Sequence, residues 1–433
     1  MAELKLPMSI SNNQAKEAAA HFSYQVLSSG QEAENILMAA KQFTHSVLLQ
    51  TFAAVFYLFA QKNSTDLKAK EHLKQAEKHL SDSTVREKMW YQAIRAWSEF
   101  NYEQAITILM AIARQWPKDL LAVKLTEWLN YCSGQVVTAK RMLTFCQEIA
   151  KENRSNSHFL AINAFAYELD NQLEEAYRLA SEAVNIEYNT PWAHHALAHY
   201  FLRSGQIKKG TEVLEGFKAS WKNILKLLSE HNHWHLALHY LAQRDEQKTI
   251  NYFNNNIWNN YPDIVLEQID AISLLWRMDM AGMAYDTTIW QDIVGYIHQY
   301  ADDHYLPFNN LHHFYALVKA GDEQTALAAF AKLKAYAIEN NAHPRWREVA
   351  LPALNGVIAF AKKDYIAASE FFKPVIDDIF IGGGSDAQNE LFTQTAMIAA
   401  INAGDIKTSK RIFNTYLSHY DKTMLAAYWS SLL

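Results

Sequence analysis

The feature that most restricts the fold of this chain is a five-residue step that recurs along it. A small or turn-forming residue ends one helical pattern, and a small residue follows five positions later, inside the next helical pattern. Two antiparallel helices can approach closely only where the side chains between them are short. The first steps are Asn101…Ala105 (one residue shorter), Gly134…Ala139, Asn171…Ala176 and Gly205…Gly210.

The small residues at 105, 139, 176 and 210 are 34, 37 and 34 residues apart. A period of about 34 residues is that of tetratricopeptide helix–turn–helix repeats. The sequence therefore predicts an all-α fold, a right-handed α-solenoid of tetratricopeptide-like helical hairpins. The same step continues more loosely at Arg244…Thr249, Gly321…Ala326, Lys363…Ala368 and Gly404…Ser409.

The repeat pattern also sets the expected domain organisation. Each hairpin of a solenoid buries its face against its neighbours, so we expect one continuous superhelical domain over residues 15–433. Residues 1–14 are expected to form a loose N-terminal tail. The regular step is lost between Ala271 and Phe308. We expect the segment 271–308 to be irregular and to contain longer or extra helices.

Composition narrows the class further. The 433 residues include 13 Gly and 8 Pro, too few for the frequent turns of a β-sandwich or barrel. The net charge of −6, without a basic stripe, argues against a nucleic-acid partner. Cys132 and Cys146 are the two cysteines, which excludes a disulfide framework and fits a reducing compartment. With no signal-peptide pattern in residues 1–13, we expect a cytoplasmic protein.

One apolar segment approaches the length of a membrane span. Residues 42–61 contain no Lys, Arg, Asp or Glu. Polar residues interrupt the segment, however, among them Ser46, Gln50 and Thr51. We therefore expect a buried solenoid helix here and no membrane partner.

Histidines are concentrated in the middle of the chain. Seven of the 18 lie between His194 and His239. His195 and His199 are four residues apart and share one helix face, and His231, His235 and His239 form a second row of the same kind. If both rows lie on first helices of successive hairpins, they face one groove on the concave side.

This histidine pattern is compatible with several functions. The side chains fit a packed, hydrogen-bonded groove wall, or a pocket that holds a small polar ligand or a peptide. A pair of histidines four residues apart also suits a divalent transition metal, with His195, His199 and His235 as the candidate ligands. Asp270 and Glu168 are carboxylates that could join such a site, and a histidine could equally act as general acid or base. No cofactor beyond such a metal is predicted.

A second candidate feature is the segment Asp270…Ser273…Arg277, whose three polar residues share one helix face among apolar neighbours. Buried charges need partners. One interpretation is therefore an internal ion pair between Asp270 and Arg277. The other is that Arg277 binds an anionic group of a ligand through both arms of its guanidinium.

Two further segments complete the predicted groove. Asn310 and His312 lie together on one expected helix. The segment Gly383-Gly384-Ser385-Asp386 reads as a loop entering a helix, with Ser385 or Asp386 as N-cap and Gln388 in the first turn. The full set of predicted groove residues is His195, His199, His231, His235, Trp234, Asp270, Arg277, Asn310, His312, Ser385 and Gln388.

From about Arg86 to Leu433 the chain resembles the tetratricopeptide repeat protein 38 family. The resemblance depends on the order of these segments: Arg86-Glu87…Ala96-Trp97, Pro117-Lys118-Asp119, Trp192-Ala193…His195…His199, His231-Asn232-His233-Trp234-His235, Asp270…Ser273…Trp276-Arg277, His312, and Gly383-Gly384-Ser385…Gln388. It implies a tetratricopeptide-like solenoid with an inner face rich in His, Asp and Arg. It implies no defined reaction.

The chain departs from that family pattern at several of these positions. Asn163 and Asn310 stand where the family has His and Asp, His233 replaces a Trp, and Asn389-Glu390 replaces an Arg-Asp pair. An amide keeps the size and hydrogen bonding of an acid or imidazole but removes its charge or basicity. The resemblance therefore implies an altered site in this chain.

We expect from these patterns a helical-repeat protein whose concave groove binds a peptide segment or a small polar ligand. In that groove Trp234 supplies apolar contact, Arg277 pairs with an anionic group, and the histidines form hydrogen bonds. The alternative is an enzyme that uses the same histidines as a metal site or as general acid and base. A third interpretation is a scaffold in which these residues are only packed.

Overall fold

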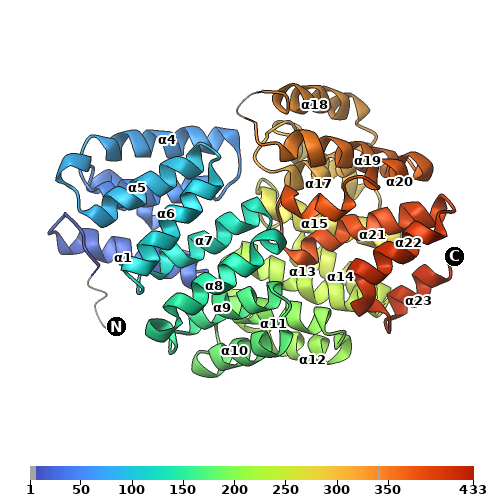
Figure 1. The fold of residues 1–433 in the computed structure, drawn as a ribbon, viewed down its shortest axis with the longest axis horizontal. Coiled ribbons are helices and arrows are strands. Elements are labelled where there is room, and N and C mark those ends of the chain that lie inside the picture. The colour runs from blue at the N-terminus through green and yellow to red at the C-terminus, as the bar shows by residue number, and fades with distance from the viewer. Residues whose placement is uncertain (1–5, 340–341) are drawn as a thin grey trace. The chain divides into compact units, whose positions relative to one another are not determined.

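The computed structural model describes residues 6–339 and 342–433. Within these ranges the chain forms helices and connecting turns and contains no β-strand, so the fold is all-α. Successive helices form antiparallel pairs that pack on neighbouring pairs, as in a helical solenoid (Figure 1). The chain divides into two compact units.

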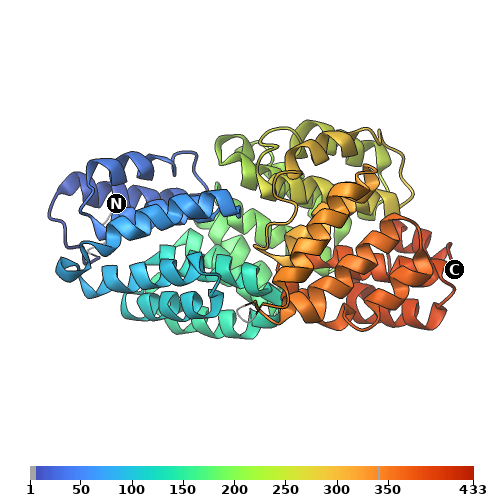
Figure 2. The ribbon, with the colours of Figure 1, turned by 90° about the horizontal axis from the view of Figure 1, so that it is seen from above.

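The N-terminal unit comprises residues up to Ser133, Thr138–Leu197 and Ser220–Leu228. Its helices α3 and α4, α5 and α6, and α9 and α10 pack as pairs. Figure 2 shows the first two of these pairs in shades from blue to cyan. The helices are α1 Asn13–Ser28, α2 Asn35–Gln42, α3 Val47–Leu58, α4 Asn63–Glu77, η1 Leu80–Asp82, α5 Val85–Ser98, α6 Tyr102–Gln115, α7 Leu120–Ser133, α8 Gln135–Asn153, α9 Ser157–Leu169, α10 Leu173–Ile186 and η2 Ser220–Asn223.

The C-terminal unit comprises Gly134–Val137, Ala198–Ala219 and Ser229–Leu433. Its N-terminal half contains α11 Pro191–Arg203 (from Ala198 onward), α12 Ile207–Phe217, α13 Lys226–Ala242 (from Ser229 onward), α14 Glu246–Tyr252, η3 Phe253–Ile257, α15 Val265–Met280, α16 Ile289–Ile297 and α17 Pro307–Lys319. The rest contains α18 Glu323–Tyr336, η4 Trp346–Ala350, α19 Leu351–Ala361, α20 Tyr365–Phe372, η5 Ile376–Gly382, α21 Asp386–Asn402, α22 Ile406–Ile412, η6 Phe413–Leu417, η7 Ser418–Tyr420 and α23 Met424–Ser430.

The five-residue step has a common backbone cause. At each step the turn residue adopts a positive φ, and the residue five positions later is a buried residue of the second helix. Except at Gly134, the N–H after the turn residue also donates to the carbonyl five residues earlier, which is the bond of a Schellman motif. The turn residues are Phe100, Gly134, Asn171, Gly205, Arg244, Gly321, Lys363 and Gly404.

Phe100 is the turn residue of the step Asn101…Ala105, which appeared one residue shorter than the other steps. The left-handed residue is Phe100 with φ 59°, and not Asn101, so its distance to Ala105 is also five residues. Asn101 instead caps α6, because its side chain accepts from the backbone N–H of Gln104. Asp245, Asp322, Asp364 and Asp405 occupy the same place after their turns and cap α14, α18, α20 and α22 in the same way.

Two predicted segments differ in detail from expectation. In the segment 271–308, α15 ends at Met280 and α16 has 9 residues, so the irregularity lies in longer connections and not in longer helices. The predicted N-terminal tail includes residues 1–5, which lie outside the described residues. Beyond them Ser9 is bound to the Glu87 carboxylate at 3.0 Å through both its N–H and its hydroxyl, and α1 begins at Asn13.

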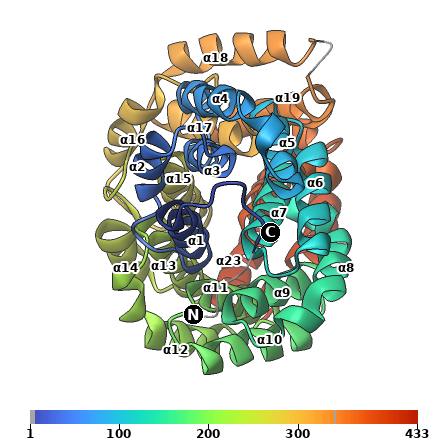
Figure 3. The ribbon, with the colours of Figure 1, turned by 90° about the vertical axis from the view of Figure 1, so that its left-hand side faces the viewer.

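The apolar segment 42–61 contains α3, which Figure 3 labels. The residues of α3 from Val47 to Val55 are buried. Among the residues that the structure describes, no helix is both long enough and apolar enough to cross a membrane. The segment therefore contributes to the core of the N-terminal unit, as predicted.

Helix α21 lies at the centre of the C-terminal unit. It contacts α15, α20 and α22, and its residues from Asp386 to Ile401 are buried (Figure 1). A helix that is buried on every side usually carries apolar residues throughout. The first turns of α21 instead carry Asp386, Gln388, Asn389 and Glu390, so their polar groups need partners inside the unit.

Candidate functional site

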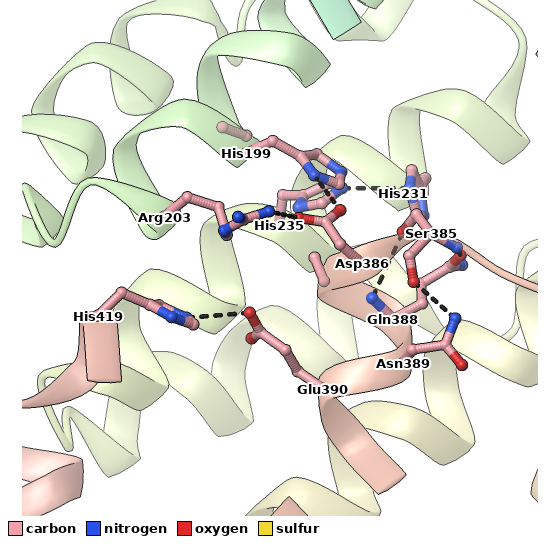
Figure 4. Close-up of polar contacts among 12 residues, drawn as sticks. His199, Arg203, His231, His235, Ser385, Asp386, Gln388, Asn389, Glu390 and His419 are labelled. Atoms are coloured by element: carbon pink, nitrogen blue, oxygen red, sulfur yellow. Dashed lines mark hydrogen bonds and ion pairs between the residues drawn. The ribbon is translucent and has the colours of Figure 1, made fainter. Parts of the chain in front are cut away.

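Four helices of the C-terminal unit bring polar side chains of the predicted site together. α11 supplies His199 and Arg203, and α13 supplies His231 and His235, each pair spaced four residues apart on one helix face. α15 supplies Asp270, and α21 begins at Asp386. Figure 4 shows the side chains from α11, α13 and α21 directed toward one another.

His231 is oriented by a carboxylate. Its Nδ1 lies 2.8 Å from Oδ2 of Asp270, so the ring donates its Nδ1 proton to that oxygen. Its Nε2 lies 3.2 Å from Nε2 of His235. The His231 ring also stacks on Trp234, with centroids 5.3 Å apart and planes 10° apart. Hydrogen bond and stacking together fix the direction in which Nε2 points.

His199 is oriented in the same manner from the other side. Its Nδ1 lies 2.9 Å from Oδ1 of Asp386, and the other oxygen of Asp386 lies 2.5 Å from Nη1 of Arg203. Burial raises the pKa of the Asp386 carboxyl, but the neighbouring His199 and Arg203 outweigh this and hold that pKa well below its usual range. Asp386 is therefore an anion at neutral pH.

His235 connects the two histidine–carboxylate pairs. Its ring centroid lies 4.7 Å from that of His231 and 4.6 Å from that of His199. The result is a series in which three imidazoles lie between two carboxylates. We refer to His199, His231, His235, Asp270 and Asp386 as the histidine chain.

Arg277 has a different partner from the one expected. The sequence suggested an Asp270–Arg277 pair, but the guanidinium donates to the Ser273 hydroxyl and, at 2.7 Å, to the carbonyl of Ala387 in α21. Its carbon lies 5.4 Å from the centroid of the Trp234 ring. Because the group is fully buried, its pKa is lowered to about 10, and it stays charged at neutral pH. Arg277 thus ties α15 to the first turn of α21.

The remaining predicted residues of the C-terminal unit have contacts of their own. Asn310 donates to the carbonyls of Ala301 and Asp303 at 3.0 and 3.1 Å, so its amide closes the loop before α17. Ser385 and Gln388 form a capping box at the start of α21, which confirms Ser385 as the N-cap.

His312 is buried among aromatic rings, including Phe308, Trp276 and Phe392. Its Nδ1 donates to the Phe308 carbonyl at 2.8 Å. Burial, reinforced by the nearby Arg277 charge, lowers the pKa of His312 to about 3, so the ring is neutral under ordinary conditions.

His195 belongs to the N-terminal unit. Within that unit its ring packs edge-on against Phe165 and Trp192, with centroids 5.0 and 5.4 Å away. Its membership of the same site as His235 stays a prediction.

Two members of this cluster were missed by sequence reasoning. Arg203 lies four residues after His199, so helix periodicity alone pointed to it. Asp386 was considered only as a helix cap, and nothing local indicates that it binds α11, 183 residues before it.

A second carboxylate cluster was also missed. Glu390 of α21 binds Nε2 of His419 at 2.9 Å and accepts from the Tyr420 hydroxyl at 3.0 Å (Figure 4). Burial and the Glu390 charge raise the pKa of Tyr420 well above its usual value, so this hydroxyl keeps its proton. The cluster anchors the turn η7 to α21.

Two pockets lie apart from the histidine chain, one in each unit. A cavity of 200 Å³ in the C-terminal unit is lined by residues of α14, η3, α15 and the segment before and in α16, among them Phe253, Met278 and Tyr285. A cavity of 290 Å³ in the N-terminal unit is lined by residues of α8, the turn after it, α9 and α10, among them Arg154, Asn163 and Arg178. Neither is lined by the predicted site residues.

No family model matches the chain.

Proposed function

We propose that the histidine chain binds a small polar ligand or a polar side chain of a peptide. The observation that carries this proposal is the serial arrangement of three imidazoles between two carboxylates inside the C-terminal unit. His231 is the most accessible of the three, with 18% of its side chain exposed, whereas His199 and His235 are buried. A ligand therefore contacts the histidine chain at His231.

A purely structural role explains this arrangement poorly. Removing charged groups from water carries a penalty of several kcal/mol per ion, and well-packed apolar residues of similar volume often stabilise a core as well or better. Within a few ångströms the unit buries two carboxylates and two imidazoles, and it partly buries a third imidazole, that of His231. Binding explains why polar groups are kept at that cost.

The chemistry of the site suits a polar ligand with both donors and acceptors. An imidazole can donate through one ring nitrogen and accept through the other. Trp234, stacked on His231, offers an apolar face beside them. The net charge of −6 argues against nucleic acid, so we propose a small molecule or a peptide as the partner.

An enzymatic role is the second candidate, and the Asp270–His231 pair favours it. A carboxylate that accepts from Nδ1 fixes the tautomer of an imidazole and leaves Nε2 as a proton acceptor. General base catalysis of this kind contributes about 10²- to 10⁴-fold in rate. Hydrolysis of p-nitrophenyl acetate at least 100-fold faster by wild type than by His231→Gln would support this role, and equal rates would contradict it.

The binding proposal is tested by a thermal-shift panel of inorganic phosphate, acetate, succinate, glycine and glutamate. Wild type is compared with the double variant His231→Ala/His235→Ala and with His298→Ala, which removes an exposed histidine. At 100 times its dissociation constant a ligand adds about 2.7 kcal/mol of stability. We expect at least one probe to raise Tm of wild type and of His298→Ala but not of the double variant. Equal shifts in all three proteins, or none, would overturn the proposal.

The fold subclass and compartment are part of the same proposal. The left-handed turn and buried small residue recur at eight places in the chain, which supports tetratricopeptide-like hairpins and the resemblance to the tetratricopeptide repeat protein 38 family. Cys132 and Cys146 are both buried, and neither is in a disulfide bond, which supports a cytoplasmic protein.

A further inference from the structure

The spacing of two ring nitrogens suggests what kind of ligand the histidine chain takes. Nε2 of His231 and Nε2 of His235 lie 3.2 Å apart. In a tetrahedral zinc site, two Zn–N bonds of about 2.0–2.1 Å place the nitrogens about 3.3 Å apart. The two atoms therefore already have the separation of two ligands on one ion, and they are carried by consecutive turns of α13.

The orientation of one ring agrees with a metal site. Nδ1 of His231 donates to Asp270. Histidines that bind metals usually donate their other ring N–H to a carboxylate, which fixes the tautomer and makes the ligating nitrogen more basic. His231 therefore presents Nε2 as its ligating nitrogen, and this atom faces His235.

We propose that His231 and His235 bind a divalent transition-metal ion through their Nε2 atoms. This inference rests on the proposed function and names the ligand class of the same site. Imidazole ligands favour Zn²⁺, Cu²⁺ or Ni²⁺ over Mg²⁺ and Ca²⁺, which prefer oxygen. The ligand pair differs from the set predicted from sequence, because it contains His231 and leaves out His195 and His199.

A buried carboxylate lies directly behind this pair of nitrogens. Asp270 accepts from Nδ1 of His231, whose ring carries no charge when it ligates a metal. An ion between the rings adds positive charge beside this carboxylate, as does the nearby Arg277 guanidinium. With two protein ligands and a partly exposed His231, the ion keeps coordination positions for further small molecules.

The test uses the full chain, treated with EDTA and then titrated with Zn²⁺ in a calorimeter and with Co²⁺ in a spectrophotometer. We expect one ion per chain and the visible absorption of tetrahedral Co²⁺. His231→Gln and His235→Gln, which keep a hydrogen-bonding amide in each place, should each weaken binding at least 100-fold. Asp270→Asn should weaken it by about 10- to 100-fold, the range for partners of metal-binding histidines. His298→Ala should bind like wild type.

Failures of the two proposals can be distinguished. If wild type binds neither ion, or if His231→Gln and His235→Gln bind as tightly as wild type, the metal inference is overturned. The panel of organic and phosphate probes, run on the metal-free protein, then decides the binding proposal by itself. Circular dichroism and Tm of each variant show that it is folded, so that a loss of binding by a folded variant supports the inference.

Discussion

Gly210 of α12 faces His239 of α13 with no room for a side chain between them. A Cβ atom at position 210 would lie 2.5 Å from Cε1 of His239 and 2.5 Å from Cβ of Phe201. On the same helix, a Cβ at Gly216 would meet no atom within 4 Å. Gly210, the small residue of the fourth repeat step, therefore sets how closely these helices pack. Gly216 on the same helix is the control position.

The two glycines should respond in opposite directions to alanine. Gly210→Ala inserts a methyl group into a filled contact and should destabilise the C-terminal unit by about 1–3 kcal/mol. Gly216→Ala removes backbone freedom from an exposed helical position and should stabilise by up to about 1 kcal/mol. Urea unfolding followed by circular dichroism measures both. Changes of the same sign would contradict this account of the step.

His239 should make the protein less stable in weak acid. Burial lowers the pKa of His239 to about 4, although the carbonyls of Ala198 and Ile207 oppose the shift. In the unfolded chain the ring takes a proton below about pH 6.5, whereas the folded ring does not until about pH 4. Its contribution is therefore fully present above pH 6.5 and is lost as the pH falls toward 4, by up to about 3 kcal/mol.

The measurement is the midpoint of urea unfolding at pH 7.5, 6, 5 and 4.5. His194 and His233 have pKa values lowered to about 4 by burial as well, so wild type should lose stability steadily across this range. His239→Gln should start from a lower stability but lose less of it. Parallel curves for the two proteins would show that His239 titrates normally in the folded state.

Replacement of Arg277 separates a structural role from ligand binding. Arg277→Met leaves the Ser273 hydroxyl and the Ala387 carbonyl without their donor, and an unsatisfied buried group costs about 1–3 kcal/mol. We expect a loss of about 3–5 kcal/mol, typical of breaking a buried charged network. A stability equal to wild type would instead show that the guanidinium is kept for an anionic ligand.

Asp386→Asn tests the buried pair at the start of α21. The amide cannot balance the Arg203 charge or accept as strongly from His199, so we expect a loss of about 3–5 kcal/mol at pH 7. The contribution of the carboxylate is present above pH 3.8, the usual Asp pKa, and is lost only as the pH falls through its lower folded pKa.

Asp377→Asn is the matched control, because this Asp binds Arg411 and Tyr416 at the surface. Exposed ion pairs contribute at most about 1 kcal/mol, and salt screens them. Unfolding in urea, without guanidinium chloride, at two salt concentrations distinguishes the Asp386 ion pair from the Asp377 ion pair. Equal effects of the two substitutions would argue that Asp386 is solvated in the folded protein.

The fold could be predicted from sequence because its signal is local. A turn residue, a cap and a buried small residue lie within six positions, so each step can be found without knowing its neighbours in space. Gly205 and Gly404 are obvious as left-handed residues, but Arg244 and Lys363 are not, because their side chains disfavour a positive φ. Phe100 was hidden for the same reason, which is why its step appeared one residue short.

The candidate site could be predicted only in part, because its contacts are not local. The row of His231 and His235 follows from helix periodicity and was found. Their partners come from other helices: Asp270 binds His231 from 39 residues away and not Arg277, its neighbour on α15. A hydrogen bond between distant helices depends on packing, for which a single sequence gives no periodic signal.

The late position of α21 in the chain has a consequence during biosynthesis. A ribosome adds about 5–20 residues per second, so Arg203 waits about 10–40 seconds for Asp386, 183 residues later. For that time the C-terminal unit is without its central helix, and His199 and Arg203 lack the Asp386 carboxylate that lies beside them in the folded protein. A stop codon just before Asp386 should therefore be as harmful to this unit as one much earlier in the chain.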